Sequence, residues 1–483
     1  MRRKRAVIIA ALVTLLFSTI ALPSNNEIIE GAWQGTLKVS GIELRIVFKI
    51  SEQSDGVLTA SMDSPDQGAK DIPVDEVIFE NGNLRLEIKS AMIVFEGKLK
   101  DDDLSIEGEL RQSGQSFPLV LKRVDEPAQV RRPQEPKKPY PYEEEEVVYE
   151  NKEAAVKLAG TLTSPGQGGP FPAVLLISGS GPQDRDETLL GHRPFLVLAD
   201  YLTRCGIAVL RVDDRGVGKS GGDFTQATSE DFASDVLAGL EYLKSREEIN
   251  PKQIGLIGHS EGGMIAPMVA VQSSDVAFII LMAGTGLTGE EILYLQTELI
   301  ARAEGVSDEV IAKNLSLQEQ MFTIVKEEKD SISAEKRLRT ILEDVTSKLE
   351  LSEKEKEMAE AKAEAQIKSI LSPWFRYFLT YDPRPTLMKV KCPVLAINGQ
   401  KDVQVPPKEN LSAIEEALKL AGNNNYTIKE LPGLNHLFQT AQTGSLSEYA
   451  RIEETISPTA LKIMSDWILE QTQDKSISDC GCQ

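Results

Sequence analysis

Apolar and polar residues alternate with period two from about residue 30 to residue 123. The runs at 36–39, 44–50 and 84–88 show this most clearly, and turn signals such as Asn81-Gly82-Asn83 separate them. Alternation of this kind is typical of half-buried antiparallel strands. About seven or eight short strands are expected, which predicts a small all-β domain, either a barrel or a sandwich. The segment contains no His and no Cys, so a structural or substrate-presenting role is expected.

The pattern changes after Val147, where strands alternate with helices. Residues 147–149 and 156–162 predict an opening antiparallel pair. Continuous apolar runs then follow, as burial on both faces of a parallel sheet requires. These predicted strands are 173–177, 207–212, 254–258, 277–282, 394–397 and 426–431, with helices at 231–246 and near 458–471. The second part of the chain is therefore predicted to be an α/β domain.

One strand of this domain runs into Gly258-x-Ser260-x-Gly262 and then into a predicted helix. A serine on a sharp turn between a strand and a helix is the arrangement of a nucleophile elbow. Glycine two residues before and after the serine is required because any side chain there would collide with the neighbouring strand and helix. The competing interpretation, a glycine-rich turn without chemistry, is excluded only by partner residues elsewhere.

A serine hydroxyl needs a base, and the base needs an acid to orient it. The chain has three histidines. His259 adjoins the serine and is expected to pack or hydrogen-bond behind the turn, and His192 is expected to be structural or at a pocket edge. His436 follows the last predicted strand, which makes it the predicted base.

Asp402 directly follows a buried strand and lies between Ser260 and His436 in the sequence. The order Ser, Asp, His is the one that the nucleophile-elbow hydrolases use. Asp402 is therefore the predicted acid, with an Asx turn ahead of Pro406 as the alternative.

A tetrahedral intermediate needs two preorganised N–H donors. The amide of Glu261 at the start of the elbow helix is predicted as one donor, since the helix dipole also favours negative charge there. The second is expected from the glycine-rich loop after residue 177, with the Ser180 amide as first choice and that of Gly179 as second.

About a hundred residues rich in helix formers interrupt the predicted sheet at 286–385. An insertion between two strands on the loop side is expected to form a lid above Ser260. The aromatic cluster at 374–378 has two interpretations, the core of the lid or the wall of an acyl pocket, and the core is favoured.

The ends of the chain have their own signals. Arg2-Arg3-Lys4-Arg5 precedes an apolar run of 17 residues with a small-residue cleavage site near Ala21. A signal peptide and export to the periplasm or the extracellular space are expected, with a retained anchor helix as the alternative. After cleavage no stable membrane insertion is expected. The predicted parts are a signal peptide 1–24, a β domain 28–124, a Pro-rich linker 125–144, an α/β domain 145–475 with its lid, and a tail 476–483.

Composition narrows the possible partners. The formal net charge is −21 and the isoelectric point about 4.8, so nucleic-acid binding is not expected because phosphate backbones would be repelled. Four cysteines are too few for a disulfide framework. Cys205 and Cys392 have the apolar surroundings of buried thiols, whereas Cys480 and Cys482 lie in the tail.

The chain from about 145 to 475 resembles bacterial exported α/β-hydrolases of the serine-aminopeptidase-like and dienelactone-hydrolase-like carboxylesterase group. The resemblance rests on ISGSGPQDRD at 177–186, DRGVGKS at 214–220 and GHSEGG at 258–263, together with Asp402 and His436. It implies an α/β-hydrolase fold and hydrolysis of acyl bonds without a metal or other cofactor, with Ser260, Asp402 and His436 as the triad. The oxyanion loop departs from the His-Gly-Gly of common lipases, because this chain has Ser178-Gly179-Ser180.

Three functions are kept open. The first is a carboxylesterase that acts on a small-molecule ester with a short acyl chain. The second is an aminopeptidase or acyl-peptide hydrolase, which a buried acidic site for a substrate amine would favour. The third is a binding protein with a degenerate hydrolase domain, against which the complete triad argues.

Overall fold

A computed structural model of the chain describes residues 26, 28–39, 42–112, 115–127, 131–348 and 353–472. The predicted signal peptide and the tail with Cys480 and Cys482 lie outside these residues. Contacts divide the chain near residue 128 into two compact units, an all-β unit and a larger α/β unit. The expected fold class is confirmed: an all-β unit precedes an α/β unit that carries a helical insertion.

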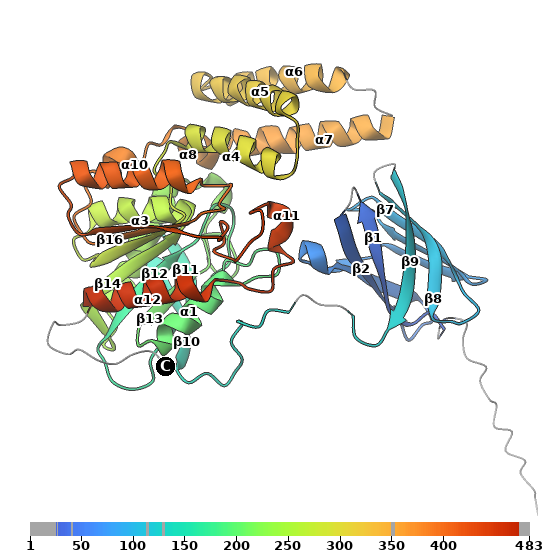
Figure 1. The fold of residues 1–483 in the computed structure, drawn as a ribbon, viewed down its shortest axis with the longest axis horizontal. Helices are drawn as coiled ribbons and strands as arrows, with labels where there is room; N and C mark the ends of the chain where they lie inside the picture. The colour runs from blue at the N-terminus through green and yellow to red at the C-terminus, as the bar shows by residue number, and fades with distance from the viewer. Residues whose placement is uncertain are drawn as a thin grey trace, which may run out of the picture. The chain divides into compact units, whose positions relative to one another are not determined.

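The all-β unit is one curled sheet with the strand order β4-β3-β2-β1-β9-β8-β7-β6-β5 (Figure 1). It is a half-barrel, not the two packed sheets of a sandwich. Trp33, Phe48 and Phe95 are fully buried and fill its interior. The sheet exceeds the seven or eight expected strands because short strands such as β4 and β5 alternate less clearly. The strands are β1 (Gly31–Val39), β2 (Ile42–Glu52), β3 (Leu58–Ser64), β4 (Ala69–Pro73), β5 (Glu76–Glu80), β6 (Asn83–Ile88), β7 (Ile93–Leu99), β8 (Ser105–Gln112) and β9 (Gln115–Val124).

The α/β unit contains an eight-stranded sheet with the order β10-β11-β13-β12-β14-β15-β16-β17. The pair β10–β11 and the pair β11–β13 are antiparallel, as the opening alternation predicts, and the other neighbours are parallel. Its strands are β10 (Glu143–Asn151), β11 (Val156–Ser164), β12 (Phe171–Ile177), β13 (Ala208–Val212), β14 (Ile249–His259), β15 (Phe278–Met282), β16 (Val394–Gly399) and β17 (Tyr426–Leu431).

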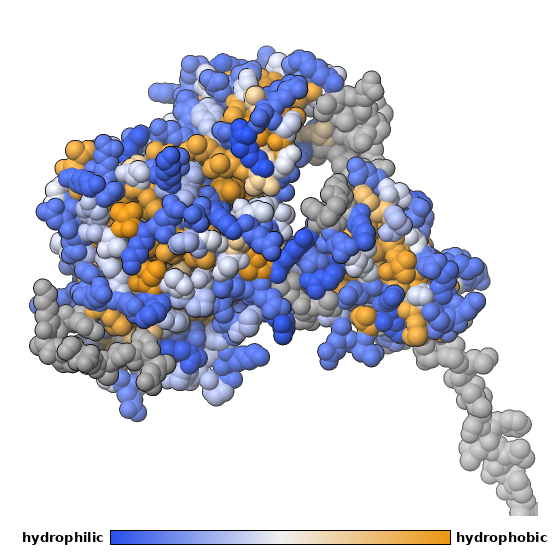
Figure 2. All heavy atoms as spheres, viewed as in Figure 1, coloured by the Kyte–Doolittle hydropathy of each residue, from blue (hydrophilic) through white to orange (hydrophobic). Residues whose placement is uncertain are grey.

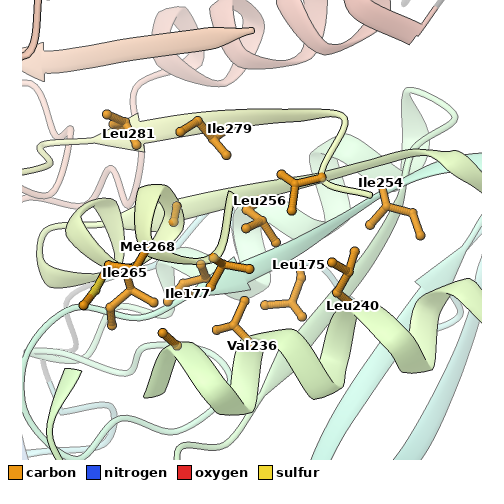
Figure 3. Close-up of a cluster of buried hydrophobic side chains, with 14 of the residues drawn as sticks. Leu175, Ile177, Val236, Leu240, Ile254, Leu256, Ile265, Met268, Ile279 and Leu281 are labelled. Atoms are coloured by element: carbon orange, nitrogen blue, oxygen red, sulfur yellow. The ribbon is translucent and has the colours of Figure 1, made fainter. Parts of the chain in front are cut away.

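Successive residues of a strand point to opposite faces of the sheet. Both faces of this sheet carry buried apolar side chains, and helices cover both. Leu175 and Leu256 face one layer, where they pack against helix residues such as Leu240 and Ile265 (Figure 3). The opposite face, which includes Leu176, packs against the other layer. The first layer consists of α2 (Ser229–Lys244), α3 (Glu261–Gln272), α9 (Arg384–Leu387) and α10 (Pro407–Leu420), and the second of α1 (Pro194–Arg204) and α12 (Pro458–Thr472).

The chain reverses its direction of travel across the sheet at β12, which has β13 on one side and β14 on the other. In open α/β sheets the crevice at such a switch point, beyond the carboxyl ends of the strands, is where ligands bind. The loop after β12 and the turn after β14 are neighbours there, since Ile177 pairs with Gly258. This edge of the sheet positions the candidate site.

The predicted insertion between β15 and β16 is helical and has its own buried core. Phe322, Leu338 and Leu379 belong to that core, whereas hydrophilic side chains cover most of the outside of the lid at the top of Figure 2. Its helices are α4 (Gly289–Ala303), α5 (Asp308–Glu327), α6 (Ser331–Ser347), α7 (Glu353–Ile370) and α8 (Pro373–Thr380), followed by α9. A short helix α11 (Leu446–Tyr449) lies further along the chain.

The Pro-rich segment ahead of β10 is anchored to the α/β unit by its polar side chains. Arg132 donates hydrogen bonds to the carbonyl oxygens of Gly191, Ala450 and Ile452. The Tyr142 hydroxyl donates to Asp200 at 2.8 Å. The described part of this segment therefore lies along the surface of the α/β unit.

Candidate active site

Ser260 occupies a strained turn between β14 and α3. Its φ of 53° and ψ of −113° lie outside the regions that L-residues normally adopt. A Cβ at Gly258 would lie 2.0 Å from the Gly262 carbonyl oxygen, and one at Gly262 would lie 2.1 Å from that of Ile177. The glycine spacing is thus required by backbone contacts, as predicted from the sequence. The turn leaves Ser260 partly exposed, which a nucleophile needs.

Ser260 opens onto a cavity of about 320 Å³. The lid supplies one wall of this cavity with Ile292 and Leu293 of α4 and with Trp374 and Phe378 of α8. The rings of Trp374 and Phe378 stack with their centroids 5.3 Å apart. Both interpretations of the aromatic cluster therefore hold in part, because Phe375 belongs to the lid core and Trp374 packs against it, while Trp374 and Phe378 also line the cavity. Residues on a helix that lie one turn apart share a face, and here that face borders the cavity.

His436 and Asp402 are buried side by side at the same end of the sheet. The His436 Nδ1 lies 2.7 Å from the Asp402 Oδ2. The other carboxylate oxygen, Oδ1, accepts the amides of Gln404 and Val405 at 2.8 Å each. The Asx turn and the histidine contact are thus made by different oxygens, so the turn does not exclude the predicted role of Asp402 as the acid. The turn fixes the carboxylate against the ring of His436.

Ser260 and His436 both line the cavity, and the hydrogen bonds formed among the described residues include none between their side chains. Catalytic hydrogen bonds are often long before substrate binds and tighten in the complex. The structure therefore brings the three predicted residues to one site, with the Asp402–His436 contact formed. Their catalytic roles stay predictions.

The predicted oxyanion donors also border the cavity. Glu261 is the first residue of α3, where helix amides have no partner within the helix and the dipole favours an anion. The Gly179 amide donates to Glu187 Oε1 at 2.7 Å, so it is not available to a substrate. Ser180 lines the cavity, and its amide remains the candidate for the second donor.

The Glu261 side chain connects the elbow to the lid. Its Oε1 accepts hydrogen bonds from Ser229 Oγ at 2.6 Å and from the Trp374 indole at 2.7 Å. Burial raises the pKa of Glu261 above its ordinary value, although the two hydrogen bonds oppose this. Glu261 therefore has a predicted role for its amide, as an oxyanion donor, and an observed contact of its carboxylate with the lid.

Asp214 fixes the loop that carries Ser180. Its two oxygens accept the Ser178 hydroxyl at 2.8 Å and the Gln183 amide at 2.9 Å. Burial raises the pKa of Asp214 to about 7, against the effect of these hydrogen bonds and with a smaller contribution from the charges of Glu261 and Glu187. A group that titrates near neutral pH thus holds both ends of the predicted oxyanion loop.

The two remaining histidines have structural surroundings, as expected. His192 is fully buried and contacts Thr455 Oγ1 and the Tyr449 carbonyl, and burial with the charge of Arg132 lowers its pKa to about 4. His259 lies behind the elbow and contacts Glu187, a residue that the sequence did not single out. Glu187 stands in a run of charged residues, which resembles a solvated surface loop until its tertiary partners are known.

Two further properties describe the site and its surroundings. Within the described ranges there is no group of three or more His, Cys, Asp or Glu residues that could hold a metal ion. Of the helices that the structure describes, none combines the length and apolar character needed to cross a bilayer.

Comparison with known proteins places this chain among hydrolases. A sequence profile described as "Serine aminopeptidase, S33" matches residues 193–440, just over half of the chain. Esterase EstD of Thermotoga maritima is 27% identical over 290 residues, which are 60% of this chain and 60% of EstD. The chain therefore spans less than two thirds of that relative.

Solved structures with a similar arrangement include two esterases. The Pyrococcus furiosus esterase Pf2001 matches with a TM-score of 0.41 and 16% identity, over 68% of this chain and 91% of the other. Est1E from Butyrivibrio proteoclasticus, solved with ferulic acid bound, matches with a TM-score of 0.40 and 18% identity, over 67% and 98% of the two chains.

Proposed function

Because the chain belongs to the family described as serine aminopeptidase, S33, we propose that it is a serine hydrolase that cleaves short-chain carboxylic esters through an acyl-enzyme on Ser260. The observation that carries the proposal is the buried Asp402–His436 contact of 2.7 Å at the cavity onto which Ser260 opens. The cavity volume of about 320 Å³ lies at the small end of ligand pockets. Its apolar lid wall suits a short acyl chain.

The proposed cycle has two halves. His436 takes the proton of Ser260 as the oxygen attacks the acyl carbonyl, and the tetrahedral oxyanion is bound by the amides of Glu261 and Ser180. Collapse expels the alcohol, which receives the proton from His436. Water then attacks the acyl-enzyme with His436 again as base, and Ser260 regains its proton as the carboxylic acid leaves.

An aminopeptidase is the second candidate, because the carboxylates of Glu187 and Glu261 border the cavity. One oxygen of each carboxylate already accepts two hydrogen bonds from the protein. These groups therefore stabilise the scaffold first, and an amine would have to compete with its donors. This favours an ester, which needs no carboxylate to bind an amine directly, over a peptide with a free amino terminus.

A fluorophosphonate activity probe tests the proposal on the full chain. We expect the wild-type protein to be labelled and Ser260→Ala to be unlabelled at the same folded concentration. No labelling of the folded wild type would oppose the hydrolase and support the third function, a binding protein. A panel of p-nitrophenyl esters and aminoacyl-nitroanilides then separates the two enzymes, and faster turnover of the anilides would favour the aminopeptidase.

A further inference from the structure

A chain of hydrogen bonds runs behind Ser260 and joins three segments that are far apart in the sequence. The Gly179 amide, in the loop after β12, donates to Glu187 Oε1 at 2.7 Å. The same oxygen lies 2.9 Å from His259 Nδ1, at the end of β14. The other ring nitrogen of His259, Nε2, lies 3.1 Å from the carbonyl oxygen of His436, in the loop after β17.

The contacts of the two ring nitrogens of His259 indicate which of them carry a proton. Both ring nitrogens face acceptors, a carboxylate oxygen and a backbone carbonyl oxygen. A neutral imidazole has one N–H and one lone pair, so it can satisfy one of these contacts only, whereas an imidazolium donates to both. Glu187 Oε1 also accepts the Gly179 amide, which fits an ionised carboxylate.

We propose that Glu187 and His259 form a buried ion pair that positions the oxyanion loop and the loop of the catalytic base at the same time, with His259 held as an imidazolium. The pair is a positioning device, since neither residue performs a step of the proposed reaction. The proposal rests on the hydrolase function proposed above.

The surroundings of the pair are consistent with a charged ring. Glu187 and His259 are 3% and 5% exposed, so water does not screen their interaction. Burial alone would lower the pKa of His259, but the charge of Glu187, the hydrogen bonds to Glu187 and to the His436 carbonyl, and the charge of Asp402 raise it above its ordinary value. The other rings against His259 are those of His436, with centroids 4.8 Å apart, and of Phe438 at 6.5 Å.

The backbone at Glu187 has an uncommon conformation. Its φ of 53° is in the left-handed region, which only a few per cent of non-glycine residues adopt. This conformation belongs to the loop that directs the carboxylate to Gly179 and His259. Ser180, the predicted oxyanion donor, is the next residue after Gly179, so the pair fixes the amide on which the transition state depends.

The first test measures the state of His259 without using activity. In the full-length protein labelled with ¹⁵N-histidine, we expect two protonated ring nitrogens for His259 at about pH 8 and one for His192. Signals are assigned by their loss in His259→Gln, His192→Gln and His436→Gln. A single ring N–H for His259 at that pH would overturn the ion pair, whether or not Ser260 proves to be the nucleophile.

The second test measures positioning. Small displacements of a catalytic group can cost about 10²-fold in rate, so we expect Glu187→Gln and His259→Gln each to lower kcat for a p-nitrophenyl ester by about 10- to 100-fold with little change in KM. The double variant should lose no more kcat than the worse single variant, because each substitution already disrupts the same ion pair. Losses that multiply would overturn the proposal, as would unchanged kcat in variants whose unfolding curves show them folded.

If Ser260→Ala retained hydrolysis, the proposed function would fail, whereas the ring protonation of His259 would still be measured independently. The two proposals can therefore be contradicted separately.

Discussion

At the scale of single residues, the two oxygens of the Asp402 carboxylate have different partners, and this gives the most specific prediction. Its Oδ1 accepts two backbone amides and its Oδ2 contacts His436. In Asp402→Asn the carbonyl oxygen should keep both amides, which places the new NH₂ group against His436 Nδ1 and stabilises the wrong tautomer. We expect kcat for a p-nitrophenyl ester to fall by about 10⁴-fold. A loss below about tenfold in a folded variant would assign the acid elsewhere.

A second residue-scale prediction concerns the pH dependence of stability. Burial first, with the nearby charges, raises the pKa of Asp214 to about 7, while an Asp in the unfolded chain titrates near 4. The native state therefore binds more protons than the unfolded state between these values, and the contribution of Asp214 to stability is lost as pH rises through about 7. In Asp214→Asn the amide can donate to the Ser178 oxygen, and this loss should vanish.

The measurement is the free energy of unfolding of wild type and Asp214→Asn by denaturant at several pH values from about 4.5 to 8. We expect the difference between the two proteins to shift in favour of the variant as pH rises. Parallel curves across that range would show that Asp214 does not titrate there.

At the scale of elements, α8 is joined to the nucleophile elbow through the Trp374 indole and Glu261 Oε1. Trp374→Phe removes this donor while it retains a ring for Phe378 to stack on. Since an intramolecular hydrogen bond contributes about 0.5–1.5 kcal/mol to stability, amide hydrogen exchange in α8 should accelerate. Tyr377→Phe is the matched control, because Tyr377 lies on the same helix α8 and donates a solvent-exposed hydrogen bond to Glu230 of α2. Equal effects of both changes would contradict a specific link between lid and elbow.

The sequence pattern predicted the helices and strands better than it predicted which residues contact one another. The apolar runs around Leu175 and Leu256 became central strands because burial on both faces leaves a continuous signal. Likewise, the glycines two residues before and after Ser260 correctly predicted close backbone contacts, because only glycine fits there. The role of Glu187 could not be predicted in this way, since its partners Gly179 and His259 meet it only through tertiary structure. The same holds for Trp374, whose face toward the cavity depends on how the lid helix is rotated.

At the scale of the whole molecule, the net negative charge favours a cationic substrate. The net charge is −21, and the described residues that line the cavity include Glu187 and Glu261 but no Lys or Arg. In the cavity the proposed His259 imidazolium offsets the charge of Glu187, and burial raises the pKa of Glu261, so the preference is expected from the charge of the whole molecule. Long-range attraction raises the local concentration and the association rate of oppositely charged ligands, and repulsion does the reverse.

We therefore expect a choline ester to be hydrolysed with a higher kcat/KM than its uncharged carbon analogue, by about tenfold at low salt, and a hemiester with a free carboxylate to be the poorest of the three. Salt screens charges over a distance that shrinks from about 30 Å at 0.01 M to about 3 Å at 1 M. The ratio of the cationic to the neutral ester should consequently fall toward one as sodium chloride is raised, while kcat/KM of the neutral ester stays constant. A ratio independent of salt would assign the preference to direct contacts in the cavity and not to the field of the molecule.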